Sequence, residues 1–359
     1  MLDLTDRKSI FYWQTDRILS ADDYAHIFLK RHDVSDDVLT KILQNGITTL
    51  PDKARITIDP ADENVVRGNV NIVRKISIKA KKYIIRMHPA GVKNGYFYVE
   101  KIALEKARDA GVPVPETLEI HSASDERDMD FMLMSVCSGT NMDEYLKKDP
   151  SHEDELLFDA GSQMANIHTI RVEGFGAFDN SVAKTQNKLL GLHQTYHEFI
   201  LTGLDENLTR LVLFEIITEQ TKDRMRRVFT NHWYEPTDGA RLIHNDFADW
   251  NLITNGRKIT GVLDWDECHA GDPIADLACW STFFSMKRMA SFMKGYTSIV
   301  TLPDDFDDRF HFYRLRYTIS KMALRAKRYQ VDKAEFIRKK IELGKIALSE
   351  ELSYFQIGE

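Results

Sequence analysis

The chain has 359 residues, a formal net charge of −7 and a hydrophobic fraction of 43%, values typical of an ordinary soluble globular protein. The acidic balance argues against a dedicated nucleic-acid binder, whose surface would be basic. Three scattered cysteines without a CxxC pair indicate a reducing environment, so we expect a cytoplasmic protein. No apolar run approaches the ~18 residues that a membrane helix needs, and the charged N-terminus lacks a signal-peptide core.

The first part of the chain predicts a helical segment followed by a small antiparallel sheet. Tyr24, Ile27 and Phe28 recur at helical spacing, whereas the later segments are β-branched and partly alternating. Gly111 is a typical helix C-cap, and the prolines that follow it favour extended backbone. In chain order we expect a helix within residues 20–46, strands at 55–59, 69–80 and 81–87, a helix at 99–111, an extended segment at 112–121 and a strand at 130–136.

The second part is predicted to be mostly helical. Small residues around Gly139 mark a break between the two parts. One pair of strands interrupts the helices, and the Asn255-Gly256 dipeptide between them favours a hairpin turn. We expect helices within residues 151–169, 188–203, 208–233, 276–296 and 310–351, the last with breaks, and strands at 251–256 and 258–265.

A dense polar cluster, IHNDFADWN, occupies residues 243–251 between two apolar runs. Phosphoryl transfer from a nucleotide requires a carboxylate that orients the attacking hydroxyl and receives its proton, and oxygen ligands that hold Mg²⁺. Asp246 is the candidate base. Asn251 and Asp264 are the candidate metal ligands, because a hairpin between them brings the two close in space.

The motif HNDFADWNLI, followed by VLDWDECHAGDPIADLA, resembles the aminoglycoside phosphotransferase and choline kinase family of small-molecule kinases. The runs NGRKITGVLDW and GFGAF are similar to its hygromycin B phosphotransferase branch. The resemblance extends over roughly residues 68–278. The residues that fall in order at the spacing of the family are Asp246, Asn251, Asp264, Gly271, Asp272 and Asp276.

This resemblance implies an α+β, bilobal protein-kinase-like fold. A small N-lobe would contain an antiparallel sheet and one helix, and a large C-lobe would be mainly helical. The implied boundaries are an N-terminal helical extension at residues 1–50, a nucleotide-covering N-lobe at 51–137, and a C-lobe at 138–359 with the catalytic loop, a helical insertion at about 180–240 and the C-terminal helices.

The resemblance also implies a site for ATP or GTP with Mg²⁺. Arg86 falls where the family has a Lys or Arg that pairs the nucleotide phosphates, and arginine keeps that charge. Spacing favours Glu100 over the rival Glu105 as the helix acid that orients this cation. The expected nucleotide-binding residues are Gly68 and Asn71 of the phosphate-covering hairpin, Arg86, Glu100, and the hinge residues Ser135 and Cys137.

Further polar residues near the motif are expected either to support the loop or to meet the acceptor. By resemblance, His244 and Asp276 brace the loop, and Asp272 is either a supporting residue or only a turn residue. The extra acids are either solvated charges or a negative wall for a cationic acceptor: Asp249, Asp266 and Glu267.

A basic helix predicted at residues 309–328 argues against a cationic acceptor. If its basic face lies inward, the acceptor is neutral or anionic; if it lies outward, the face is simply solvated. The basic residues are Arg314, Arg316, Lys321, Arg325, Lys327 and Arg328.

Two features favour a small acceptor over a protein. Ala248 stands two residues after the candidate base, where Ser/Thr protein kinases carry a lysine, and the short stretch between Asp264 and Gly271 has no room for an activation segment. We expect transfer to a hydroxyl of a small molecule, most simply an aminoglycoside-type antibiotic, with a sugar, amino alcohol or similar metabolite as the alternative. A non-catalytic nucleotide-binding module is the alternative of another class. Neither nucleic acid nor membrane is an expected partner, and the oligomeric state stays open.

Overall fold

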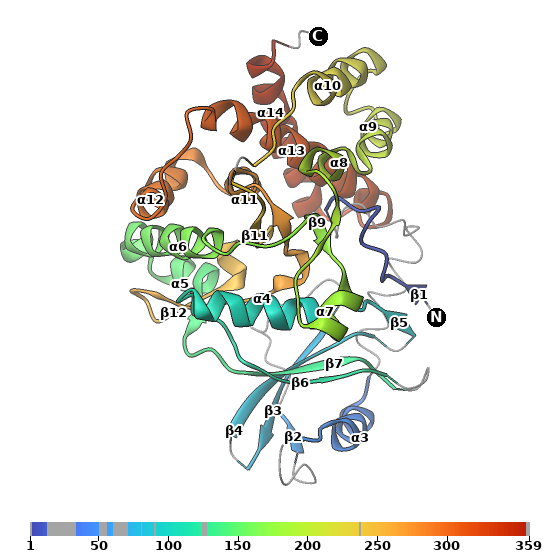
Figure 1. Cartoon of the computed structure of the whole chain (residues 1–359), viewed down its shortest axis with the longest axis vertical. Coiled ribbons are helices and arrows are strands. Elements are labelled where there is room, and N and C mark those ends of the chain that lie inside the picture. The colour runs from blue at the N-terminus through green and yellow to red at the C-terminus, as the bar shows by residue number, and fades with distance from the viewer. Residues whose placement is uncertain are drawn as a thin grey trace.

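The computed structural model describes residues 2–12, 34–49, 56–59, 71–79, 81–89, 91–123, 128–236 and 238–356. These residues form a small lobe with the largest sheet and a large, mainly helical lobe, drawn below and above in Figure 1. The predicted α+β, bilobal fold is therefore confirmed.

Antiparallel strands in the order β2-β3-β4-β7-β6 form the sheet of the small lobe. Ile76 of β3 lies opposite Tyr83 of β4, and Ile85 of β4 lies opposite Leu133 of β7. These four side chains are buried on one face, since cross-strand partners and alternate residues share a face. The strands are β2 (Ile56–Ile58), β3 (Ile72–Ile78), β4 (Lys81–Met87), β6 (Thr117–His121) and β7 (Phe131–Ser135).

Among the described residues, helices α3 and α4 complete the small lobe. Helix α3 (Asp36–Gly46) packs Leu39 and Leu43 into the core of the sheet. Helix α4 (Phe97–Asp109) lies between the sheet and the large lobe in Figure 1, and its buried side chains join the core of the large lobe. The N-terminal β1 (Leu2–Asp3) pairs in parallel with β5 (Val92–Lys93), which brings the first described segment next to the start of α4.

Short strands of the large lobe carry the polar cluster of the sequence. One sheet has the order β10-β9-β14-β11 and another the order β13-β12-β8. The predicted Asn255-Gly256 hairpin is present between β12 and β13, with Gly256 at a φ of 92°. The strands are β8 (Thr140–Asn141), β9 (Phe175–Phe178), β10 (Gly191–His193), β11 (Arg241–Ile243), β12 (Leu252–Thr254), β13 (Ile259–Val262) and β14 (His269–Gly271).

Close helix packing builds the rest of the large lobe. Helices α6 and α12 approach so closely that a Cβ at Gly161 would lie 2.0 Å from the backbone oxygen of Phe292. The helices are α5 (Met142–Lys148), α6 (Glu153–His168), α7 (Asn180–Gln186), α8 (Tyr196–Leu201), α9 (Leu204–Leu213), α10 (Glu219–Asn231), α11 (Pro273–Ser281), α12 (Met286–Thr297), α13 (Phe306–Val331) and α14 (Glu335–Tyr354). Single 3₁₀ turns in the described part of the large lobe are Pro150–His152, Asp249–Asn251 and Trp265–Glu267.

Two of the predicted helices are wrong in extent because backbone geometry overrides their periodicity. Within residues 188–203 only α8 is helical, since Gly191 packs its backbone against Phe175 and belongs to β10. The helix predicted over residues 208–233 is split at Glu215, whose φ is 56°, and resumes after the side chain of Thr218 caps α10.

The other predicted helices need smaller corrections. The one at residues 276–296 is α11 and α12, and a hydrogen bond from the Thr282 hydroxyl to the Cys279 carbonyl (2.6 Å) marks the end of α11. The one within residues 20–46 is described only from residue 34 onward, where α3 follows. In the part of the chain that the structure describes, no helix has both the length and the hydropathy of a membrane span.

Candidate active site

The carboxylate of Asp276 anchors the loop after β11, residues 244–251, to helix α11. Asp276 of α11 accepts hydrogen bonds from the backbone nitrogens of His244 (2.8 Å) and Asn245 (3.0 Å) and lies 3.2 Å from Nε2 of His168. Burial opposes its charge, yet the contact with His168 and these hydrogen bonds lower the pKa of Asp276. Asp276 thus fixes the loop as an ionised, buried anchor.

The backbone of the loop is further fixed at Asn245, which has a φ of 69°. The hydroxyl of Tyr317 on α13 donates to Oδ1 of Asn245 (2.6 Å), and the thiol of Cys279 on α11 lies 3.0 Å from its carbonyl oxygen. A left-handed backbone at a non-glycine residue persists only where surrounding contacts hold it. These contacts come from two different helices of the large lobe.

His244 connects the loop to the end of β13. Its Nδ1 accepts from the backbone nitrogen of Asp246 (3.3 Å), so its Nε2 is the donor to the carbonyl of Leu263 (3.1 Å). Burial lowers the pKa of His244, which keeps the ring neutral. His244 therefore connects the backbone of Asp246 to that of Leu263, the residue before Asp264. Both of its ring nitrogens are hydrogen-bonded, so neither is free for proton transfer.

Asp246 and Asn251 form the centre of the loop. Nδ2 of Asn251 donates both to the backbone oxygen (2.8 Å) and to Oδ2 (2.9 Å) of Asp246. Burial and the neighbouring Asp264 carboxylate raise the pKa of Asp246 to about 7. Both of these hydrogen bonds use the amide nitrogen of Asn251 and neither uses its Oδ1.

Asp264 lies at the end of the hairpin with a φ of 63°, and its side chain is 38% exposed. Among the described residues, no group of three or more His, Cys, Asp and Glu side chains could hold a metal. Asn251 and Asp264 offer two oxygen ligands, which suits Mg²⁺ because this ion takes most of its ligands from water and phosphates. The two side chains thus fit the predicted ion.

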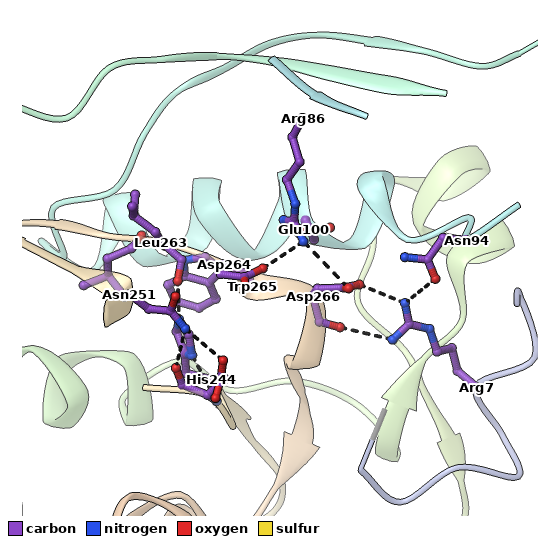
Figure 2. A network of polar contacts seen from close by, with 12 residues as sticks. Arg7, Arg86, Asn94, Glu100, His244, Asn251, Leu263, Asp264, Trp265 and Asp266 are labelled. Atoms are coloured by element: carbon purple, nitrogen blue, oxygen red, sulfur yellow. Dashed lines mark hydrogen bonds and ion pairs between the residues drawn. The ribbon is translucent and has the colours of Figure 1, made fainter. Parts of the chain in front are cut away.

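Arg86 of β4 reaches down to Asp264, as Figure 2 shows. Its Nη2 lies 2.8 Å from Asp264 Oδ1 and 3.7 Å from Asp266 Oδ2, and its Nη1 donates to Glu100 of α4. Burial opposes the charge of Arg86, but the three carboxylates outweigh it and raise its pKa. The rival Glu105 instead lies 3.7 Å from Lys101.

The other described residues that were expected to bind the nucleotide are Asn71, Ser135 and Cys137. With its amide oxygen toward Arg86, Asn71 accepts from Nε (3.0 Å) and Nη2 (2.7 Å) of that residue. Ser135 exchanges hydrogen bonds with the backbone of Glu116, and burial raises the pKa of Cys137 to about 11, which keeps its thiol protonated at neutral pH. Gly68 lies outside the described residues.

A family model described as the phosphotransferase enzyme family matches residues 67–308, a range that contains every member of this centre. The chain belongs to this phosphotransferase family.

A curated protein is similar in sequence over part of its length. Hygromycin-B 4-O-kinase of Escherichia coli is 21% identical over 209 residues, which cover 56% of this chain and 57% of that protein. The chain thus aligns with little more than half the length of this curated relative.

Two solved structures show the extent of the fold likeness. The structure of aminoglycoside phosphotransferase APH(4)-Ia with AMP-PNP and hygromycin B is 17% identical, with a TM-score of 0.59 over 82% of this chain and 94% of that one. A Ralstonia eutropha protein assigned to the aminoglycoside phosphotransferases is 14% identical, with a TM-score of 0.62 over 90% and 99% of the two chains.

In this member of the phosphotransferase family, Asp272 supports the fold next to the site. Its Oδ1 caps α11 by accepting from the backbone nitrogen of Ile274 (3.0 Å). Its Oδ2 accepts from Arg309 (3.0 Å) and from the hydroxyl of Tyr313 (2.9 Å), both on α13. Asp272 therefore ties α11 to α13 and has a larger structural role than a turn residue.

The three extra acids are neither solvated nor gathered into a wall around Asp246. All three are buried. Asp249 Oδ2 accepts from Arg288 of α12 (2.7 Å), and Asp266 Oδ1 accepts from Arg7 (2.8 Å). Asp266 and Glu267 instead border a small separate pocket beside Arg7. Sequence reasoning missed these partners because both arginines are distant in the chain.

Asp246 borders a cavity of about 450 Å³. We call it the Asp246 cavity; Asn251 and Asp264 also border it, and its far walls are α13, α14 and Tyr12 of the N-terminal segment. The basic helix contributes to it in part, which the sequence left open. The cations that line the cavity are Lys321, Arg325 and Arg328 of α13 and Lys340 of α14.

The remaining arginines of α13 serve the fold. Arg314 pairs with Glu350 (2.7 Å) and Glu351 of α14. Arg316 is fully buried and donates to the carbonyls of Ile200 and Thr202 (2.6 Å each). Neither Tyr12 nor Lys340 could be found from the motifs, since both lie outside the stretch that resembles the family.

Proposed function

We propose that this protein transfers the terminal phosphoryl group of ATP or GTP to a hydroxyl of a small molecule, with Mg²⁺ as the cofactor. One observation carries this proposal. Asn251 is hydrogen-bonded to Asp246 on one border of the Asp246 cavity, and Asp264, which also borders it, is paired with Arg86 of the small lobe. This is the set of a base, two oxygen ligands and a phosphate-binding cation that phosphoryl transfer requires.

Asp246 is the proposed base. It orients the acceptor hydroxyl and takes its proton, while the acceptor oxygen forms a bond to the terminal phosphorus and the bond to the bridging oxygen of the nucleotide breaks. A pKa of about 7 lets Asp246 accept a proton near neutral pH. The hydrogen bond from Asn251 fixes the direction in which the carboxylate points.

Asn251 Oδ1 and the Asp264 carboxylate are the proposed ligands of Mg²⁺. When bound, this ion neutralises charge on the phosphoryl group in transfer. Arg86 adds a permanent positive charge, and Glu100 and Asn71 hold its guanidinium in place. The nucleotide is proposed to lie against the sheet of the small lobe, with Asn71 and Arg86 near its phosphates and the backbone of residues 135–137 near its nucleobase. The AMP-PNP bound in the APH(4)-Ia structure supports nucleotide binding.

The small size of the acceptor is supported by the segment after Asp264. It consists of a single 3₁₀ turn, Trp265–Glu267, and the short strand β14, which pairs with both β9 and β11. All of this backbone is engaged in the fold. It offers no extended platform for a protein substrate, whereas the Asp246 cavity has the volume of a small-molecule site.

Two kinds of acceptor are candidates. The name of the Escherichia coli relative and the hygromycin B in the APH(4)-Ia complex favour an aminoglycoside. The cations that line the Asp246 cavity favour a metabolite of the opposite charge. Both candidates are hydroxyl compounds, so the proposed chemistry is the same for either.

The test is release of ADP or GDP by the full chain with Mg²⁺, against a panel of aminoglycosides, hygromycin B, sugars, amino alcohols, hydroxy acids and sugar phosphates. We expect acceptor-dependent release with at least one compound and a stoichiometric phosphorylated product. Tight nucleotide binding without transfer to any compound would favour the non-catalytic module instead. Incubation with casein and labelled ATP checks for a protein kinase, and we expect no labelled protein.

A further inference from the structure

We infer that the acceptor carries an anionic group, a carboxylate or a phosphate, which the cations of α13 and α14 hold while its hydroxyl meets Asp246. This inference rests on the proposed function and specifies its substrate class. It assigns a binding site to Arg325 and Lys340, with Lys321 between them and the base.

The cations of the cavity are arranged on two facing helices. Lys321, Arg325 and Arg328 follow one another at i, i+4 and i+7 on α13, a spacing that places them on one face of the helix. Lys340 comes from α14, and Nη1 of Arg325 donates to the backbone oxygen of Lys340 (3.2 Å). That bond joins the two helices next to the Asp246 cavity, which both cations line.

Three of these cations, Lys321, Arg325 and Lys340, have no carboxylate partner among the described residues. Lys321 donates instead to the hydroxyl of Thr282 (2.5 Å) and lies 3.3 Å from the ring centre of Phe283. Elsewhere on the same helices the cations do pair, as Arg314 does with Glu350.

The cations also repel one another. Partial burial, followed by the charges of Arg325 and Arg328, lowers the pKa of Lys340, and burial lowers the pKa of Lys321 to about 8. Like charges collected in one cavity raise the free energy of the empty state, and a bound anion would relieve this repulsion. Arg and Lys are the side chains that bind carboxylate and phosphate groups most strongly.

The rest of the cavity wall fits the same acceptor. The acids among its described lining residues are Asp246 and Asp264, which the proposed function assigns to the hydroxyl and the metal. Leu324, Ile337 and Leu343 give the wall an apolar part for the carbon skeleton. A polycationic aminoglycoside would bring its ammonium groups against Arg325 and Lys340, which costs binding energy.

The experiment compares acceptors that differ in one group. Glucose, glucosamine, gluconate and glucose 6-phosphate form one set, and glycerol, 3-amino-1,2-propanediol, glycerate and glycerol 3-phosphate form the other. We expect kcat/KM for an acid or phosphate to exceed that of its neutral and amino counterparts by about tenfold or more, the effect of one charged hydrogen bond. Comparison of gluconate and glycerate with the two phosphates shows whether the site prefers a carboxylate or a phosphate.

Variants assign the effect to the two helices. Arg325→Gln and Lys340→Gln should each raise KM for the anionic acceptor about tenfold, and Arg325→Lys should restore part of the affinity. Lys339→Gln is the matched control, because Lys339 is exposed like its neighbour Lys340 on α14 but does not line the cavity. A neutral or amino compound as the best acceptor, or equal effects of Arg325→Gln and Lys339→Gln, would overturn the inference.

Binding without turnover separates this inference from the proposed function. Calorimetry with the Asp246→Asn variant measures binding of each acid directly. Binding of an acid that is lost in Arg325→Gln, together with no transfer to any compound by the unmodified protein, supports the anion site and refutes the phosphotransferase proposal. Transfer to a neutral compound, with no binding of any acid, would support the phosphotransferase proposal and refute the anion site.

Discussion

Arg7 and Asp266 form a buried ion pair of 2.8 Å between residues 259 positions apart in the chain. Arg7 also donates to Oδ1 of Asn94 (3.0 Å), and its guanidinium lies 4.0 Å from the ring centre of Tyr96. The second oxygen of Asp266 lies 3.7 Å from Arg86, as the right half of Figure 2 shows. One carboxylate thus connects the N-terminal segment to the cation of the proposed nucleotide site.

Replacement of Arg7 by methionine should destabilise the protein. Asp266 would remain buried without the cation that lies 2.8 Å from its Oδ1, and breaking one side of a buried pair costs ~3–5 kcal/mol. We expect a loss of about that size in the free energy of unfolding, measured by urea denaturation. Lys8→Met is the control, since Lys8 is exposed. Equal stability of the two variants would show that the Arg7 contact contributes nothing.

Asp246→Asn should separate chemistry from binding. The amide keeps the shape of the side chain but cannot take a proton, so turnover should fall by the ~10²–10⁴ typical of a general base. Nucleotide affinity, measured by calorimetry with Mg²⁺ present, should change little because Asp246 faces the acceptor side. Near-normal turnover on the best acceptor would remove Asp246 from the role of base.

Asp264→Asn should weaken the affinity for nucleotide in a way that depends on the metal. With Mg²⁺ we expect a loss of about tenfold or more, because one charged ligand is gone. With EDTA in place of Mg²⁺ the variant and the unmodified protein should bind nucleotide about equally. A loss of the same size with and without the metal would instead assign Asp264 to the positioning of Arg86.

Glu100→Gln should loosen Arg86. The loss of a charged hydrogen bond in a buried pair predicts a fall of ~1.5–3 kcal/mol in the free energy of unfolding, together with weaker nucleotide binding. Glu105→Gln on the same helix is a close control, because its partner Lys101 and its own side chain are each 40% exposed and such pairs contribute ~1 kcal/mol or less. If the two variants behave alike, the Glu100 contact has no special weight.

His269 should make the protein less stable in mild acid. Burial lowers the pKa of His269 to about 4, so the folded state binds fewer protons than the unfolded state between pH 6.5 and 4. Its contribution is fully present above pH 6.5 and is lost as the pH falls through this window, by at most about 3 kcal/mol. His269→Gln should flatten this part of a stability–pH curve. An unchanged slope would mean that other groups cause the acid sensitivity.

The parts of the fold that were predictable are those with a local pattern. The strand at β4 and the helix at α4 follow from alternation and helical spacing within about ten residues, and the Asn255-Gly256 turn follows from its own conformational preference. Strand β10 could not be predicted, because it depends on backbone contact between Gly191 and Phe175. The two residues of β8 are too few to show any pattern.

The same distinction applies to the site. The order of Asp246, Asn251 and Asp264 is readable because all three lie in one hairpin-containing segment. Asp249 and Asp266 were open to an exposed interpretation because acids are mostly exposed. Their arginine partners are 39 and 259 positions away, and nothing in the sequence signals such pairs.

The walls of the Asp246 cavity have unequal origins in the chain. The residues proposed for phosphoryl transfer lie within the range 67–308 that matches the family, whereas the cations of α13 and α14 come after it. Reaction and recognition are therefore encoded in separate stretches of sequence. On this division, the C-terminal helix pair could diverge to accept new compounds while the residues of phosphoryl transfer stay the same, so relatives with the same motif need not share a substrate.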